Sequence, residues 1–105
     1  MAEIKPSLTK KIKFFVKRLN ENGIKTQKAY IFGSYAKGTE TKLSDIDVAI
    51  VSSDLKDDRF TERLRLMKIA LEIDGRIEPV PFNAKTFVEE DPLVWEILRT
   101  GILIH

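Results

Sequence analysis

A glycine–serine pair and two alternating aspartates are the residues of this sequence best suited to chemistry. Gly33-Ser34 follows a short apolar run, and after ten intervening residues Asp45-Ile46-Asp47 leads into a second apolar run. Glycine lets the backbone approach a ligand closely, and successive N–H groups in such a turn form an anion-binding concavity. Side chains alternate along a strand, so Asp45 and Asp47 share one face. Two adjacent carboxylates repel unless a cation relieves them, and hard oxygen ligands suit Mg²⁺ or Mn²⁺. The pattern predicts a site for a metal–nucleotide complex.

Two buried strands are expected to position these residues. Residues 28–32 predict the first strand, and residues 34–38 predict a short helix or tight turn. Such a helix would place Gly33 and Ser34 at its N-terminus, where phosphate is favoured. The second strand is expected from residue 45 to about 51, and carboxylates at its mouth are costly unless they are paired or bound to metal. The structural alternatives are an ordinary turn after a strand and two carboxylates that face water.

Further helices and a third strand are expected around this pair. Residues 7–22 predict a first helix, with Ser7 as its N-cap, and residues 60–74 predict a second. Residues 76–82 predict the third strand, and the prolines in it place that strand at a sheet edge or at strand ends. The stripe of the second helix expected to face the core consists of Phe60, Leu64, Met67, Ala70, Leu71 and Ile73.

The C-terminal part of the chain is strongly apolar. Residues 87–100 predict a last helix whose start carries acidic residues and Pro92. Its apolar residues exceed one stripe, so part of this helix, with residues 102–104, is expected to form an interface. Core packing is favoured for Trp95 itself. His105 is the only histidine and is expected at a frayed end, so no Ser-His-Asp, Cys-His or zinc arrangement can be assembled.

Composition describes a small globular chain. Of its 105 residues, 43% are hydrophobic and 32% are charged, and the net charge of +2 is too mild to argue for nucleic-acid binding. The chain has no cysteine, which excludes disulfides and thiolate metal sites. No apolar run approaches the roughly 20 residues that span a bilayer, and the N-terminus has no apolar signal core. We therefore expect one α/β domain, in the cytoplasm and without membrane contact.

The two motifs together resemble the signature of the minimal nucleotidyltransferases, which belong to the DNA polymerase β-like superfamily. Gly33-Ser34 and Asp45-Ile46-Asp47 carry the resemblance, because both occur at this spacing and each is attached to an apolar strand. Minimal members are about as long as this chain. The resemblance implies an α/β (α+β) fold with a small mixed β-sheet and helices packed on one side. It identifies residues 1–105 as a single minimal nucleotidyltransferase domain.

The same resemblance implies the carboxylates of the site. Asp45 and Asp47 would hold one or two Mg²⁺ ions on the triphosphate of ATP. The family carries a third carboxylate on a neighbouring strand, and Glu78 is the acidic residue placed to supply it. Glu78 would complete the metal site or act as the base toward the incoming hydroxyl. Many members have Asp at this position, so Glu78 departs from the pattern, and an exposed glutamate on an edge strand is the alternative.

The resemblance also implies the phosphate ligands and the reaction. The Gly33 N–H and Ser34 would bind the phosphate tail of ATP, and Lys37 would neutralise charge on it. Attack of a hydroxyl in line on the α-phosphorus would transfer AMP and release pyrophosphate. Several minimal members are antitoxins paired with a HEPN-domain ribonuclease. The expected partner and acceptor is therefore a HEPN toxin, whose tyrosine hydroxyl would receive AMP and whose activity would be silenced.

Two other functions stay open. The chain could be a non-catalytic antitoxin that neutralises its partner by binding through the apolar C-terminal helix, which is also where a homo- or hetero-oligomer contact is expected. It could instead transfer a nucleotide to a small molecule such as an aminoglycoside, although the chain has no room for an additional substrate-binding domain. Direct nucleic-acid binding by the basic first helix has little support, because Phe14 and Phe15 are the only aromatic residues among its lysines.

Overall fold

A mixed four-stranded sheet forms the centre of the computed structural model, which describes residues 4–105. In the order β3-β2-β1-β4, its strands are β1 (Lys28–Phe32), β2 (Ile46–Ser52), β3 (Ile77–Asn83) and β4 (Ile102–Leu103). β1 runs antiparallel to β2 and β4, whereas β2 and β3 are parallel. Pro79 and Pro81 are compatible with β3 because it is an edge strand. The predicted α/β class, mixed sheet and edge position of the third strand are confirmed.

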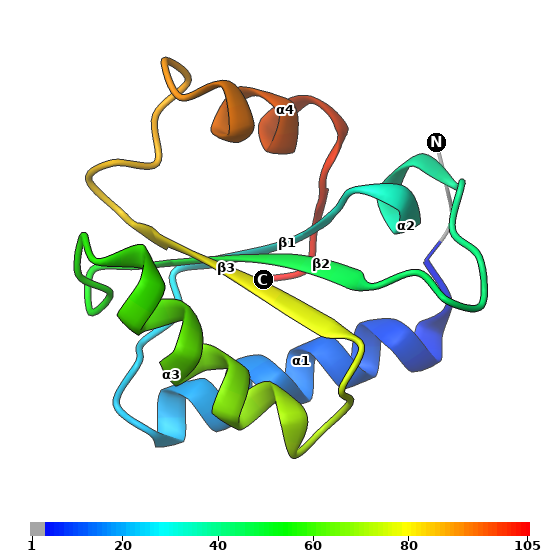
Figure 1. Ribbon diagram of the computed structural model, residues 1–105, viewed down its shortest axis with the longest axis horizontal. Coiled ribbons are helices and arrows are strands. Elements are labelled where there is room, and N and C mark those ends of the chain that lie inside the picture. Colours follow the sequence, from blue (N-terminus) through cyan, green and yellow to red (C-terminus); the bar gives the residue numbers. More distant parts are fainter. Residues whose placement is uncertain (1–3) are drawn as a thin grey trace.

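Helices lie on both faces of the sheet. They are α1 (Pro6–Glu21), α2 (Ser34–Lys37), α3 (Arg59–Leu71) and α4 (Pro92–Thr100). Figure 1 shows α1 and α3 on one side of the sheet and α4 on the other. The expectation of helices on one side is therefore right for α1 and α3 and wrong for α4. A sheet with apolar residues on both faces has two faces to cover, and the apolar side of α4 covers the second.

Alternation along the strands divides the core into two layers. The layer under α1 and α3 contains strand residues that include Ala29, Ile31, Ile46, Val48 and Ile50. The layer under α4 contains Tyr30, Phe32, Ala49, Val51 and Phe82, packed with Val94 and Ile97. Asp47 lies between Ile46 and Val48 in the sequence, so its side chain lies on the α4 face of the sheet.

The first and last helices begin at different residues from those predicted. α1 starts at Pro6, and its N-cap is Lys5 rather than Ser7, without a side-chain capping bond. Proline suits this position because a first-turn N–H has no partner inside the helix. α4 starts at Pro92 because the Asp91 side chain accepts a hydrogen bond from a backbone N–H of the first turn. Within residues 4–105, no helix is long and apolar enough to cross a membrane.

α3 turns a different side to the core from the one the sequence predicts. Phe60 and Leu71 of the predicted stripe are 75% and 65% exposed. The burial of Glu62 is tolerated because its Oε2 accepts a hydrogen bond from the backbone N–H of Lys56 at 2.7 Å. Both sides of the helix carry apolar residues at helical spacing, so periodicity alone admits either. The residues that α3 buries are Glu62, Leu66, Ile69 and Ala70.

The end of the chain forms a strand that the sequence analysis does not predict. β4 pairs with Tyr30 and Ile31 of β1. Beyond β4, the backbone N–H of Ala29 donates to the His105 carbonyl at 3.1 Å, and the His105 N–H donates to the Ala29 carbonyl at 3.3 Å. The expectation of a frayed end at His105 is therefore wrong, because β1 holds this residue.

Trp95 on α4 is outside the core. Its side chain is 48% exposed, and the guanidinium of Arg99 lies 4.6 Å from the centre of its ring. The core-packing prediction for Trp95 is therefore wrong. Leu98 and Leu103 are exposed as well. An interface on this side of the molecule stays a prediction.

Candidate active site

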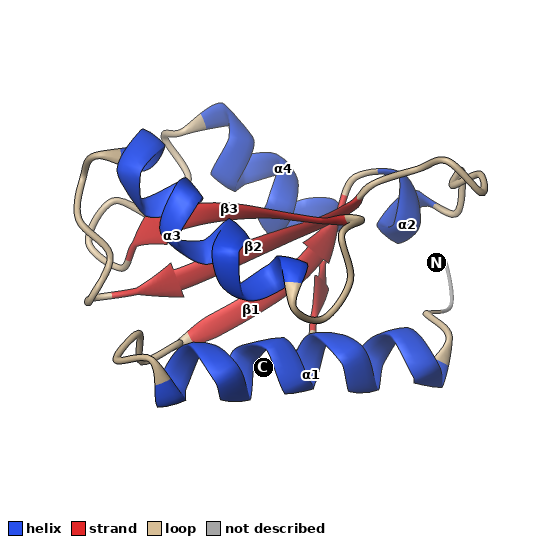
Figure 2. Cartoon of the chain, turned by 60° about the horizontal axis from the view of Figure 1, so that its bottom comes forward, coloured by secondary structure: helices blue, strands red, loops and turns tan. Residues whose placement is uncertain are grey.

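Three residues of neighbouring strands form a row across the sheet. The register pairs Phe32 with Asp47, and Asp47 with Glu78. Glu78 therefore lies beside Asp47 on the same face. Asp45 comes two residues before Asp47, just ahead of β2, so its side chain is expected on this face too. The row lies where β1 ends and β2 and β3 begin, and Figure 2 shows α2 at this end of the sheet.

Gly33 connects β1 to α2 and packs against Asp47. Its φ of +71° lies in a region that residues with a side chain rarely adopt. A Cβ atom at this position would overlap Oδ2 of Asp47 and lie 3.2 Å from its Cγ. Glycine is therefore required both for the turn and for the position of the carboxylate. The sequence predicts a close approach at Gly33, and the group that the structure places there is Asp47.

Ser34 is the first residue of α2, and Gly33 is the N-cap. The carbonyls of Gly33 and Ser34 accept hydrogen bonds from the N–H groups of Lys37 and Thr39, at 3.1 and 3.0 Å. The N–H groups of a first helical turn have no partner within the helix. The N–H groups of the first turn of α2 come directly after Gly33, the residue that packs against Asp47. The Gly33–Ser34 turn therefore places backbone N–H donors beside Asp47, and their role as phosphate ligands stays a prediction.

Asp47 is the carboxylate of the row that its surroundings perturb. Burial raises the pKa of Asp47, and the negative charges of Asp45 and Glu78 raise it further. The positive charge of Arg63 acts in the opposite direction. Burial and like charges both disfavour the ionised form of a carboxyl group. The three carboxylates therefore concentrate negative charge that a bound cation would relieve.

Arg63 is a residue of the site that the sequence analysis misses. Its Nη2 donates a hydrogen bond to Oε2 of Glu78 at 2.5 Å, and the pair is only partly buried. Arg63 comes directly after Glu62, at the border of the buried side of α3. Had the buried side of α3 been assigned correctly from the sequence, Arg63 would have been expected near β3. The helical pattern of α3 was therefore the available signal, and its wrong assignment hid Arg63.

Lys37 forms an ion pair with α4 and not with the carboxylate row of Asp45, Asp47 and Glu78. Its Nζ lies 2.8 Å from Oε1 of Glu96, and both side chains are nearly half exposed. Exposed pairs of this kind contribute about 0–1 kcal/mol, so exchanging Glu96 for a phosphate would cost little. The role of Lys37 on the phosphate tail stays a prediction.

The carboxylates fit a magnesium ion that is shared with a phosphate. Across residues 4–105, no three His, Cys, Asp or Glu side chains gather closely enough to enclose a metal ion. Mg²⁺ is usually bound through one or two carboxylates, and substrate phosphates and water complete its shell. Asp45 and Asp47 provide such a pair, and the pKa of Asp47 is raised by its burial and then by the negative charges of Asp45 and Glu78. Glu78 would have to leave Arg63 to become a third ligand, so that role stays a prediction.

Comparison of the sequence with known proteins gives two matches. The family model described as "Polymerase beta, Nucleotidyltransferase" matches residues 10–105. The chain is also 34% identical over 73 residues to the protein adenylyltransferase MntA of Shewanella oneidensis. That similarity covers 70% of this chain and 52% of MntA, so the chain spans about half the length of this relative.

Solved structures share the fold. A chain of a toxin–antitoxin complex with AMP-PNP matches with a TM-score of 0.60 at 26% identity, over 92% of this chain and 72% of that chain. A chain of a complex between tri-AMPylated Shewanella oneidensis HEPN toxin and MNT antitoxin matches with a TM-score of 0.55. The second match covers 94% of this chain and 71% of that chain at 24% identity, and it shows the fold alone.

Proposed function

Because the chain belongs to the polymerase β nucleotidyltransferase family, we propose that it transfers AMP from ATP to a hydroxyl group of a protein. The observation that carries this proposal is the packing of the Asp47 carboxylate on the Gly33 backbone. It brings a carboxylate pair that suits Mg²⁺ next to backbone donors that suit phosphate, as a metal–triphosphate complex requires. The proposal treats residues 1–105 as one minimal nucleotidyltransferase domain.

The residues of the site divide the work of this reaction. Asp45 and Asp47 would hold Mg²⁺, which would supply positive charge for the entering and leaving oxygens. The N–H groups of the Gly33–Ser34 turn and the Ser34 hydroxyl orient the triphosphate. The acceptor oxygen bonds to the α-phosphorus as the bond to the pyrophosphate oxygen breaks, and pyrophosphate leaves. Glu78 would take the hydroxyl proton once its ion pair with Arg63 has opened.

A protein acceptor is supported by the relatives of this chain. The relative MntA is named a protein adenylyltransferase, and a similar chain occurs in a toxin–antitoxin complex with AMP-PNP. We therefore take the acceptor to be a tyrosine of a HEPN-domain toxin and this chain to be its antitoxin.

An antitoxin that acts by binding alone is the second candidate. The exposed apolar side chains of Trp95, Leu98 and Leu103 favour it, because aromatic residues often anchor protein interfaces. The ion pair of Glu78 with Arg63 favours it as well, since it occupies the third carboxylate. In this case the partner would be inhibited by contact, and Asp45 and Asp47 would be dispensable.

Release of pyrophosphate separates these functions. The chain is incubated with ATP and Mg²⁺ and with either a candidate HEPN-domain partner protein or an aminoglycoside. The proposal predicts release with the HEPN protein only, and loss of release without Mg²⁺ or in Asp45→Asn/Asp47→Asn. Release with the aminoglycoside alone would make the chain a small-molecule transferase. A stable, inhibited complex without release would make it a binding antitoxin.

A further inference from the structure

A concavity lies on the face of the sheet that α1 covers, opposite the face that carries Asp47. It has a volume of about 510 Å³. Its wall is formed by the start of α1, by Tyr35, by the loop of residues 40–42 and by Arg76. Leu8 belongs to the core layer under α1, and Tyr35 packs against that layer. The cavity is therefore separate from the carboxylate row, although Tyr35 directly follows Ser34.

Cationic side chains dominate this cavity. Lys5, Lys11, Lys42 and Arg76 line it, whereas Glu40 is the acidic residue of the lining. Asp74 adds a second negative charge beside Lys11 and Arg76, which leaves a surplus of two positive charges. Neither Lys5 nor Lys42 forms an ion pair with another residue of the range 4–105.

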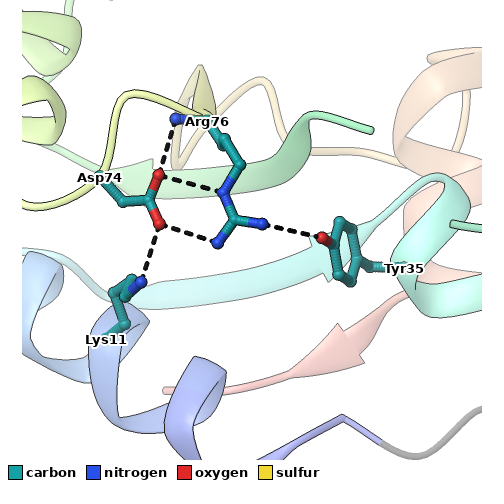
Figure 3. Close-up of polar contacts among 4 residues, drawn as sticks. All are labelled: Lys11, Tyr35, Asp74 and Arg76. Carbon is teal, nitrogen blue, oxygen red and sulfur yellow. Dashed lines mark hydrogen bonds and ion pairs between the residues drawn. The ribbon is translucent and has the colours of Figure 1, made fainter. Parts of the chain in front are cut away.

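Asp74 holds two of these cations in place. Its Oδ2 lies 2.8 Å from Nζ of Lys11 and 2.9 Å from Nη2 of Arg76, as Figure 3 shows. Arg76 and Lys11 keep the pKa of Asp74 far below its usual range, so it stays ionised at neutral pH. The Nη1 atom of Arg76 lies 3.4 Å from the Tyr35 hydroxyl. Lys11 and Arg76 are thus held in place before any ligand arrives.

The start of α1 adds positive potential to the same cavity. The N-cap of α1 makes no side-chain hydrogen bond, and the first turn carries no acidic residue. Ser7 of this turn lines the cavity. The N-terminal end of a helix carries a partial positive charge, which favours an anion nearby. Helix and side chains therefore act in the same direction.

We propose that this cavity binds a phosphorylated small molecule through its chain of phosphates. Hydrogen bonds of lysine and arginine with phosphate are charge-assisted and therefore stronger than neutral hydrogen bonds. The volume of the cavity also lies within the range of about 300–1,000 Å³ typical of small-molecule sites. The Arg76 carbonyl accepts a hydrogen bond from the Ile46 N–H at 2.8 Å, and Ile46 lies between Asp45 and Asp47 in the sequence. A ligand that contacts Arg76 would therefore touch a residue hydrogen-bonded to the segment that carries both aspartates. The inference does not depend on the proposed function.

Calorimetric titration of a variant that lacks the carboxylate pair tests this site. Asp45→Asn/Asp47→Asn is titrated in EDTA with inorganic pyrophosphate, ATP and AMP, so that no metal–nucleotide site contributes. Lys5→Glu/Lys42→Glu is then added to this background. Lys13→Glu/Lys17→Glu is the matched control, because it makes the same charge change on exposed residues of α1 that do not line the cavity. Circular dichroism verifies that each variant is folded.

The expected result is saturable binding of pyrophosphate or ATP that Lys5→Glu/Lys42→Glu weakens by about tenfold or more, as loss of charged hydrogen bonds implies. The control should leave this affinity unchanged. Equal affinity for pyrophosphate and ATP would show that the cavity recognises phosphates alone. Tighter binding of ATP than of pyrophosphate would show that the nucleoside contributes to binding as well. Absence of saturable binding, or equal weakening by both variants, would overturn the proposal. An RNA oligonucleotide that binds more tightly than either ligand through Lys5 and Lys42 would overturn it too.

Discussion

The carboxylate of Asp47 packs so closely on the backbone of Gly33 that no Cβ atom fits between them. β1 ends just before Gly33, and Asp47 is the second residue of β2. Two motifs that lie apart in the sequence are therefore a single unit in space. This unit joins the donors of a turn to a pair of carboxylates, and it explains why glycine is needed at its centre.

Replacement of Gly33 by alanine should remove activity and lower stability. The positive φ costs about 1–3 kcal/mol for a residue with a side chain, and the added Cβ would displace the Asp47 carboxylate. Gly23→Ala is the matched control, because Gly23 has a φ of +84° and open space around its added Cβ. Both variants should lose stability in denaturant unfolding, and only Gly33→Ala should also lose activity. Pyrophosphate release that survives in Gly33→Ala would contradict the role of this contact.

Asp47→Asn should raise the melting temperature of the metal-free protein while it removes activity. Burial, Asp45 and Glu78 raise the pKa of Asp47, so the ionised carboxylate is disfavoured in the folded state. This destabilisation is present above the raised pKa and disappears as the pH falls through it. Asparagine removes the charge at every pH. Thermal unfolding at neutral pH in EDTA measures the effect, and Asp57→Asn, a change at an exposed loop residue, should leave the melting temperature unchanged. A lower melting temperature in Asp47→Asn would refute this electrostatic account.

Removal of Mg²⁺ should weaken nucleotide binding at the carboxylate pair. Saturation with AMP-PNP and Mg²⁺ at 100 times the dissociation constant stabilises a folded protein by about 2.7 kcal/mol. Wild type should gain more melting temperature with AMP-PNP and Mg²⁺ than with AMP-PNP in EDTA, and Asp45→Asn/Asp47→Asn should lack this Mg²⁺-dependent difference. An equal gain in EDTA for wild type would mean that the aspartates do not act through a cation.

The fold around the site was predicted where local chemistry imposes it. Gly33 shows a conformational demand that few other residues meet, and Pro79 and Pro81 restrict β3 to an edge. The buried side of α3 was not predicted, because both of its sides carry apolar residues at helical spacing. The buried side includes Glu62, and no periodicity reveals that the backbone of Lys56 would donate a hydrogen bond to this residue. The two residues of β4 are likewise too few to show a pattern, and they become a strand only beside β1.

Arg63→Gln should shift the acidic limb of the activity profile to higher pH. Arg63 lowers the pKa of Asp47 and pairs with Glu78, so its loss leaves the carboxylates less compensated. More protons would then compete with the cation at a given pH. Lys68→Gln, an exposed change on the same helix, should leave the profile in place. A profile that is identical in Arg63→Gln and wild type would show that Arg63 does not tune the site.

Trp95→Ser should weaken the complex with the partner while leaving the chain itself stable. Exposed substitutions usually change stability by less than about 0.5 kcal/mol, whereas loss of an aromatic anchor at an interface often costs about 2 kcal/mol or more. Titration of the chain with its partner measures the affinity of the complex, and denaturant unfolding measures the stability of the chain itself. Phe60→Ser on α3 is the control for an exposed aromatic residue elsewhere. A loss of affinity in Phe60→Ser alone would move the interface to α3.

The central claim is that Asp45 and Asp47 serve the transfer of AMP to a protein hydroxyl, and the intact mass of the acceptor tests it most directly. The HEPN-domain partner is incubated with ATP and Mg²⁺ and with either wild type or Asp45→Asn/Asp47→Asn. We predict that its mass increases in steps of one AMP with wild type only, and that a variant lacking the modified tyrosine gains none. A partner whose mass stays unchanged while wild type still binds and inhibits it would contradict the claim.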